Sequence, residues 1–133
     1  MRDFVSSCAD LRTFDVSSLV TSGAHRVDDF FMNTAITNTA IYAGIANWDI
    51  SSLKENGQED WEEVVVVNSG LYRLLNSTTN EMSTAEYNAV LEAWVLDNTS
   101  NMTVDFDAAV ADGDGATAHA VLVARGWTIT DGD

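Results

Sequence analysis

The chain contains no proline, one cysteine, two histidines and only six lysine and arginine residues among its 133 positions. The lone Cys8 excludes an internal disulfide framework and a thiolate metal site. A tetrahedral zinc site needs three or four ligands, and neither His25 nor His119 has a cysteine or second histidine at ligand spacing. No apolar run approaches the roughly 18 residues that a membrane-spanning helix needs. The sequence therefore indicates a fold that depends on its apolar core.

Basic residues are outnumbered by 21 aspartates and glutamates, which gives the chain a formal net charge of −15. A nucleic-acid-binding protein needs the opposite sign, because its affinity comes largely from neutralising phosphates. An anionic membrane surface would also repel this chain. We therefore expect neither nucleic acid nor a membrane among its partners, and we interpret the acidity as favouring solubility and limiting self-association.

Apolar residues make up 46% of the chain, a proportion that is ordinary for one globular domain of this length. The first residues, Met-Arg-Asp-Phe, lack the continuous apolar segment of a secretory signal. We expect either that a signal belongs to a longer parent chain, or that the protein leaves the cell by assembly and lysis.

One phrase occurs twice in the first half of the chain. Residues 14–19 read Phe-Asp-Val-Ser-Ser-Leu and residues 48–53 read Trp-Asp-Ile-Ser-Ser-Leu, so the two copies start 34 residues apart. Repetition at a period of roughly 20 to 50 residues is typical of a solenoid, in which each unit buries its apolar face against its neighbours. A solenoid more often presents a surface that holds a partner than a catalytic pocket.

Local patterns predict short strands that alternate with helices. The predicted strands are residues 13–17, 47–51, 64–67, 102–106 and 127–130. A capping box of Ser83 and Glu86 predicts a helix over residues 84–96. A second helix is predicted over residues 116–125, with Asp114 as its N-cap and Gly126 as its stop. This alternation favours an α/β fold with parallel strands.

Two stretches resemble the BspA-like leucine-rich repeat family of bacterial surface proteins and phage virion proteins. The first is the repeated phrase with its lead-in Phe4-x-x-x-Cys8-x-x-Leu11. The second begins with Met-Ser-Thr-Ala-Glu-Tyr at residues 82–87 and ends with Gly-Trp-Thr-Ile-Thr-Asp-Gly at residues 126–132. It is similar to the unit that ends many arrays of that family.

The resemblance implies a short leucine-rich-repeat-like solenoid with parallel strands. Residues 1–80 would form irregular BspA-like repeats, and residues 81–133 a C-terminal helix-strand-helix-strand cap, a β-α capping unit, within one compact domain. The second unit is longer than the family repeat, and Ala35 stands at its cysteine position. The resemblance also implies extracellular or virion placement, and it supplies no catalytic residues.

Acidic residues recur in two arrangements that are open to a functional or a structural interpretation. Asp15 and Asp49 recur with Ser17 and Ser51, either as a ligand ladder or, as we favour, as groups that satisfy the backbone at strand-to-turn junctions. A second group of aspartates lies near glycines, as in calcium sites: Asp105, Asp107, Asp112 and Asp114. Its spacing matches no EF-hand loop, so we expect no metal and no cofactor.

Candidate partner contacts are apolar and aromatic. Tyr42, Trp61 and Tyr72 are possible recognition aromatics, although we expect two of the three to pack in the core. Tyr42 falls within residues 37–44, where the second unit carries about seven extra residues of the kind that often form a binding edge. The N-terminal edge of the solenoid has no cap, so Phe4, Val5 and Leu11 are expected to contact a neighbouring protein, with Tyr42 as a further contact.

These observations favour a non-enzymatic structural or attachment protein on a particle surface. The leading prediction is a phage virion component, a capsid decoration or tail accessory protein, held on the virion exterior in symmetric copies with a host-surface ligand as a further partner. One alternative is a module of an adhesin on the bacterial cell surface. The other is a glycan-active enzyme with paired carboxylates, which is disfavoured because no pair of acids stands out from the acidic background.

Overall fold

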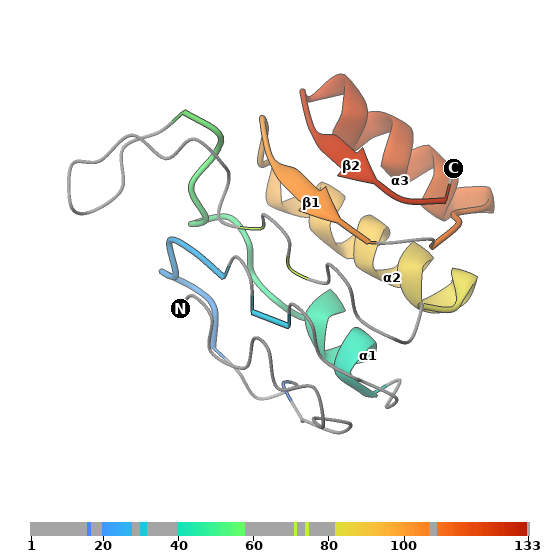
Figure 1. Ribbon diagram of the computed structural model, residues 1–133, viewed down its shortest axis with the longest axis horizontal. Coiled ribbons are helices and arrows are strands. Elements are labelled where there is room, and N and C mark those ends of the chain that lie inside the picture. Colours follow the sequence, from blue (N-terminus) through green and yellow to red (C-terminus); the bar gives the residue numbers. More distant parts are fainter. Residues whose placement is uncertain are drawn as a thin grey trace.

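The computed structural model describes residues 16, 20–27, 30–31, 40–57, 71, 74, 82–106 and 109–132. Within these residues the regular elements follow the order α1, α2, a short 3₁₀ helix η1, β1, α3 and β2 (Figure 1). The predicted strands over residues 13–17 and 64–67 lie largely or wholly outside the described residues. The fold mixes helices with a small two-stranded parallel sheet, as the predicted α/β class requires.

The helix α2 (Thr84–Trp94) begins where the sequence predicts it. The Glu86 backbone N–H donates to Ser83 Oγ at 3.3 Å, and the Ser83 backbone N–H donates to Glu86 Oε2 at 2.9 Å, which completes the capping box. The helix continues as η1 (Val95–Asp97) and stops at Asn98, whose φ of 54° lies in the left-handed region that asparagine tolerates. The predicted helix over residues 84–96 is therefore confirmed.

The strands β1 (Thr103–Asp105) and β2 (Thr128–Thr130) pair in parallel, with Val104 opposite Ile129. The helix α3 (Gly113–Ala124) connects them and packs against α2, as Figure 1 shows. A parallel pair requires such a crossover, so this β-α-β arrangement confirms the prediction of parallel strands here.

The start of α3 differs from its prediction. The helix begins at Gly113 with Asp112 in the N-cap position, and Asp114 lies inside its first turn. The Asp112 side chain makes no capping bond, because its Oδ1 accepts from the Asn88 side chain of α2 at 2.6 Å. A contact with another helix therefore determines this boundary, and local sequence alone does not reveal it.

One cluster of buried apolar side chains runs through the described part of the chain. It joins residues of the predicted repeat region to residues of the predicted cap. Its largest fully buried members are Tyr42, Phe30, Phe31, Ile45, Ile50, Leu71, Leu74, Tyr87, Trp94 and Phe106. The helix α1 (Ala40–Ala46) contributes by packing against α2. The Trp94 indole donates to the Ile45 carbonyl at 3.3 Å, which adds a polar tie between these helices.

The repeated phrase has the predicted burial but not the predicted strand. Val16 and Ile50, at equivalent positions, are both buried, and Asp49 is exposed. Residues 48–50 form no strand, and a turn follows at residues 50–53, where the Leu53 N–H donates to the Ile50 carbonyl at 3.0 Å. Just before this turn, Asp49 Oδ1 accepts from the Ser51 backbone N–H at 3.0 Å. The aspartate thus offers the backbone a local partner in place of a strand ladder.

The structure extends this repeat beyond the recognised phrase. Gly23 and Gly57 stand at the same 34-residue spacing and have nearly equal φ values of 80° and 78°. An L side chain rarely adopts that conformation, so both copies need glycine at this turn. The two units therefore share a backbone conformation at Gly23 and Gly57 as well as the quoted phrase.

Candidate functional site

Four segments of the described chain lie side by side through main-chain hydrogen bonds, and we call them the stacked segments: residues 21–27, 48–57, 97–106 and 125–131. The Lys54 N–H donates to the His25 carbonyl at 2.9 Å. The Asn56 N–H donates to the Asn101 carbonyl at 2.8 Å, and the Asn101 N–H donates to the Arg125 carbonyl at 3.1 Å. Each segment is thus bonded to the next one along the chain.

Polar side chains strengthen the contact between the second and third stacked segments. Asp97 Oδ2 accepts from the Ile50 N–H at 2.9 Å, and Asn56 Nδ2 donates to Thr103 Oγ1 at 2.8 Å. Because Ile50 pairs with Asp97 and the later Asn56 pairs with the later Thr103, these two segments run in the same direction. The Glu55 carboxylate accepts from Ser100 Oγ at 3.0 Å. These polar groups hold one segment to another.

The third and fourth stacked segments approach each other closely at Gly126. The φ of Gly126 is 85°, and a Cβ placed there would lie 2.5 Å from Asn101 Oδ1. Nearby, the Trp127 indole donates to the Thr99 carbonyl at 3.1 Å. The backbone conformation therefore favours glycine at position 126, and a Cβ there would also force the Asn101 side chain to move.

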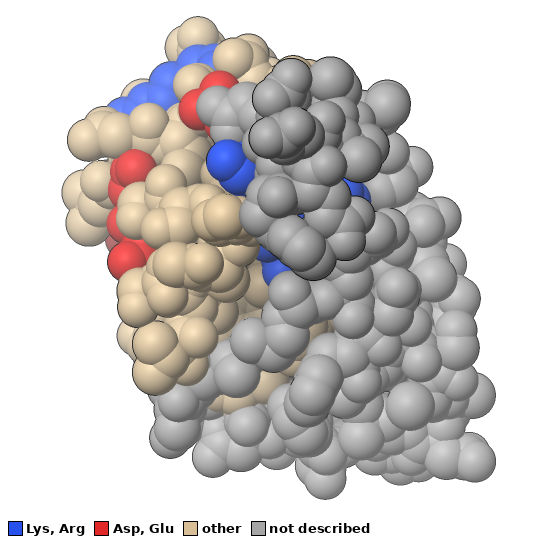
Figure 2. All heavy atoms as spheres, turned by 90° about the vertical axis from the view of Figure 1, so that its left-hand side faces the viewer, with Lys and Arg blue, Asp and Glu red and all other residues tan. Residues whose placement is uncertain are grey.

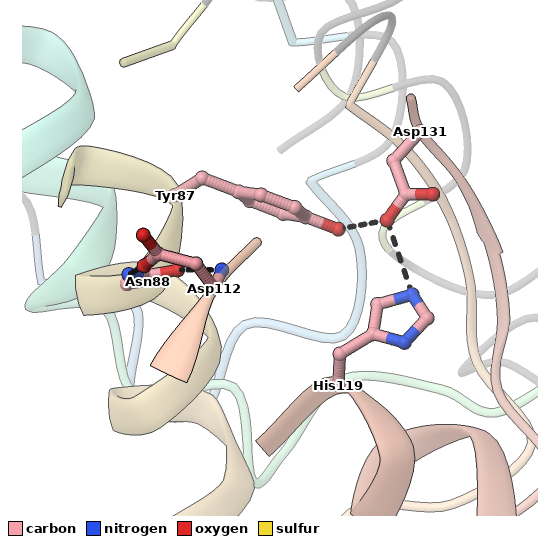
Figure 3. A network of polar contacts seen from close by, with 5 residues as sticks. All are labelled: Tyr87, Asn88, Asp112, His119 and Asp131. Atoms are coloured by element: carbon pink, nitrogen blue, oxygen red, sulfur yellow. Dashed lines mark hydrogen bonds and ion pairs between the residues drawn. The ribbon is translucent and has the colours of Figure 1, made fainter. Parts of the chain in front are cut away.

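A polar cluster of Tyr87, His119 and Asp131 joins α2, α3 and the end of β2 (Figure 3). The Tyr87 hydroxyl donates to Asp131 Oδ2, and His119 Nε2 lies 3.1 Å from the same oxygen. The Asp131 side chain is only 4% exposed and the His119 side chain 22%. The His119 contact is an ion pair when the imidazole is protonated, and it lacks the alignment of a hydrogen bond.

The chemistry available to this cluster is limited by its surroundings. A histidine beside a carboxylate is the arrangement that orients a general base toward a nucleophile. Here the nitrogen that faces the carboxylate is buried, and the tyrosine hydroxyl is bonded to the same carboxylate. The main role of the cluster is therefore to join α2, α3 and the end of β2, and we call it the three-way tie.

A second polar contact, also drawn in Figure 3, joins α2 to the start of α3. Asn88 Nδ2 donates to Asp112 Oδ1 at 2.6 Å, and the Asp112 N–H donates to Asn88 Oδ1 at 3.2 Å. Gly115 lies so close that a Cβ there would be 2.0 Å from Asn88 Oδ1. Asp112, one of the four aspartates of the calcium-like group, is thus engaged in helix packing. Among the described residues no group of three or more His, Cys, Asp or Glu side chains is arranged to hold a metal ion.

The predicted contact residues have different outcomes. Phe4, Val5 and Leu11 lie outside the described residues, as do Trp61 and Tyr72. Tyr42 lies on α1 and is only 1% exposed, so its interpretation as an exposed contact is wrong. Its ring belongs to the core cluster, and the helix that carries it, α1, packs against α2. The sequence spacing of His119 gives no sign of its approach to Asp131, 12 residues further along the chain.

Asp49 is the exposed carboxylate of the repeated phrase. The Ser51 hydroxyl donates to Asp49 Oδ1 at 2.5 Å, and this bond together with the Ser51 backbone N–H lowers the pKa of the Asp49 carboxyl. The structural interpretation of this Asp-Ser pair is therefore confirmed at residues 49–51, where the aspartate satisfies a turn. Its counterpart at Asp15 and Ser17 lies outside the described residues.

Charge is unevenly distributed over the described surface. The Lys and Arg residues that the structure describes are Arg26, Lys54 and Arg125, and each lies in a stacked segment. Figure 2 shows Lys and Arg atoms on the described part of one face, with Asp and Glu atoms in separate places near them. Arg125 Nη1 donates to the Val95 carbonyl at 2.7 Å, so this cation is partly occupied in ending α3 against η1. The described cations therefore all belong to the stacked segments.

The outer side of α3 is apolar by contrast. Val121 and Val123 are partly exposed on it, and Leu96 on the adjoining η1 is 77% exposed. Within the described residues no helix has the length and apolar character needed to cross a membrane.

Comparison with known proteins gives no relative: no family model matches the chain, and no curated protein or solved structure matches it either.

Proposed function

We propose that the chain is a short leucine-rich-repeat-like solenoid of the BspA-like type, with irregular repeats over residues 1–80 and a closing unit over residues 81–133. The support for this architecture is the bonding of each stacked segment to the next, together with the repeat that extends to Gly23 and Gly57. A solenoid end needs a cover to remain soluble, and the β-α-β unit at residues 103–130 supplies one.

The function of this architecture is to occupy a position on a particle. The protein is a non-enzymatic structural or attachment protein, most specifically a phage virion component on the virion exterior, as a capsid decoration or tail accessory protein. The observation that carries the proposal is the use of polar side chains: Glu55, Asn56 and Asp97 each hold one stacked segment to the next. Because these polar groups are used to hold the segments together, binding of a partner would depend on the shape and area of the surface that the segments present.

The net charge of −15 supports the same function, because like charge keeps the outward faces of neighbouring particles from sticking to one another or to nucleic acid. The partner is a protein of the assembly, contacted in symmetric copies through Phe4, Val5 and Leu11 at the N-terminal edge. An adhesin module on a bacterial cell surface would use the same architecture, and differs in the surface that carries it.

A second candidate from another class is a glycan-active enzyme. The contact between His119 and Asp131 brings a base and an acid together, although glycan hydrolysis ordinarily uses two carboxylates. Such an enzyme would lose turnover on substitution of either residue while its stability changed little. The three-way tie with Tyr87 leads to the opposite expectation, a loss of stability, and therefore favours the structural role.

The test is mass spectrometry and electron microscopy of purified virions and of cell envelopes from the organism that encodes the chain. We expect the protein in purified virions at a constant stoichiometry and on their outer surface. Its presence only in cell envelopes would select the adhesin. Its absence from both, combined with turnover of a glycan by the soluble protein, would replace the proposal with the enzyme.

A further inference from the structure

We draw no further inference here: the strongest candidate, the uncharged outer face of α3 with Ala116, Ala120 and Ala124 in line, carries nothing because nothing in the described part of the structure shows what covers it.

Discussion

Replacement of Gly126 by alanine tests the close approach of the third and fourth stacked segments. The substitution places a Cβ at a φ of 85°, which costs about 1 kcal/mol for a residue that is not glycine. The same Cβ would lie 2.5 Å from Asn101 Oδ1, which is the end of a side chain that can move, so we expect a further cost of about 1 kcal/mol, the low end for overpacking. We therefore expect Gly126→Ala to lower the free energy of unfolding by about 2 kcal/mol.

The chain offers a matched control in Gly57. Its φ of 78° imposes the same backbone strain, but among the described residues a Cβ there would meet nothing within 4 Å. Gly57→Ala should therefore cost only about 1 kcal/mol, the conformational part of the penalty. The difference between the two variants isolates the contact between Gly126 and Asn101.

A double variant tests the same contact from its other side. Asn101 has a φ of 50°, so Asn101→Gly keeps an accessible backbone conformation and removes the side chain that obstructs position 126. In that background Gly126→Ala should cost about 1 kcal/mol, because the steric part is gone. Urea denaturation followed by circular dichroism gives each free energy. Equal losses for Gly126→Ala and Gly57→Ala, or no coupling with Asn101→Gly, would refute the reasoning.

Three further substitutions follow from the same structure. Trp48→Ala removes a side chain that is only 3% exposed and should lower the free energy of unfolding by about 3–5 kcal/mol in a thermal or urea melt. Leu96→Ala, at a position that is 77% exposed, should change that free energy by less than about 0.5 kcal/mol. An equally small loss for Trp48→Ala would contradict its place in the core. Asp131→Ala removes the carboxylate that accepts from the buried Tyr87 hydroxyl and should lower the free energy of unfolding by about 1–3 kcal/mol. In the Tyr87→Phe background the loss should be smaller. Fully additive losses would exclude an interaction between the two side chains. The bonds from Ser51 lower the pKa of the Asp49 carboxyl in the folded state. They therefore add a small stability at any pH above the pKa of the unfolded state, and this contribution is lost as the pH falls through the pKa of the folded state. Ser51→Ala should therefore lower the urea midpoint at pH 7 but not at pH 2, roughly, and an equal effect at both would count against it.

Sequence patterns predict those parts of the fold whose causes are local. The capping box at Ser83 and Glu86 places α2, because both partners lie within one helical turn. Alternation of strand and helix over residues 103–130 likewise predicts the parallel pair. Both features depend on neighbours that are visible in a short window of sequence.

Other parts depend on contacts between distant residues. The start of α3 depends on Asn88, which lies on another helix, and the turn at Asp49 displaces a strand that the apolar alternation favours. The burial of Tyr42 follows from the packing of α1 on α2.

The polar cluster brings together residues 87, 119 and 131 from three elements. No spacing rule connects them. The position of Asp131 directly after a strand was the one available signal, since side chains at strand ends often meet those of the adjoining helices.

Amide hydrogen exchange followed by nuclear magnetic resonance tests the stacked segments most directly. The amides of Lys54, Asn56 and Asn101 donate across neighbouring segments, so each should exchange slowly, in step with the amide of Tyr87 in α2. Slow exchange at all three positions is the result that the account predicts. Exchange of these amides at unprotected rates, while the Tyr87 amide stays protected, would show that the segments are not stacked and would contradict the account.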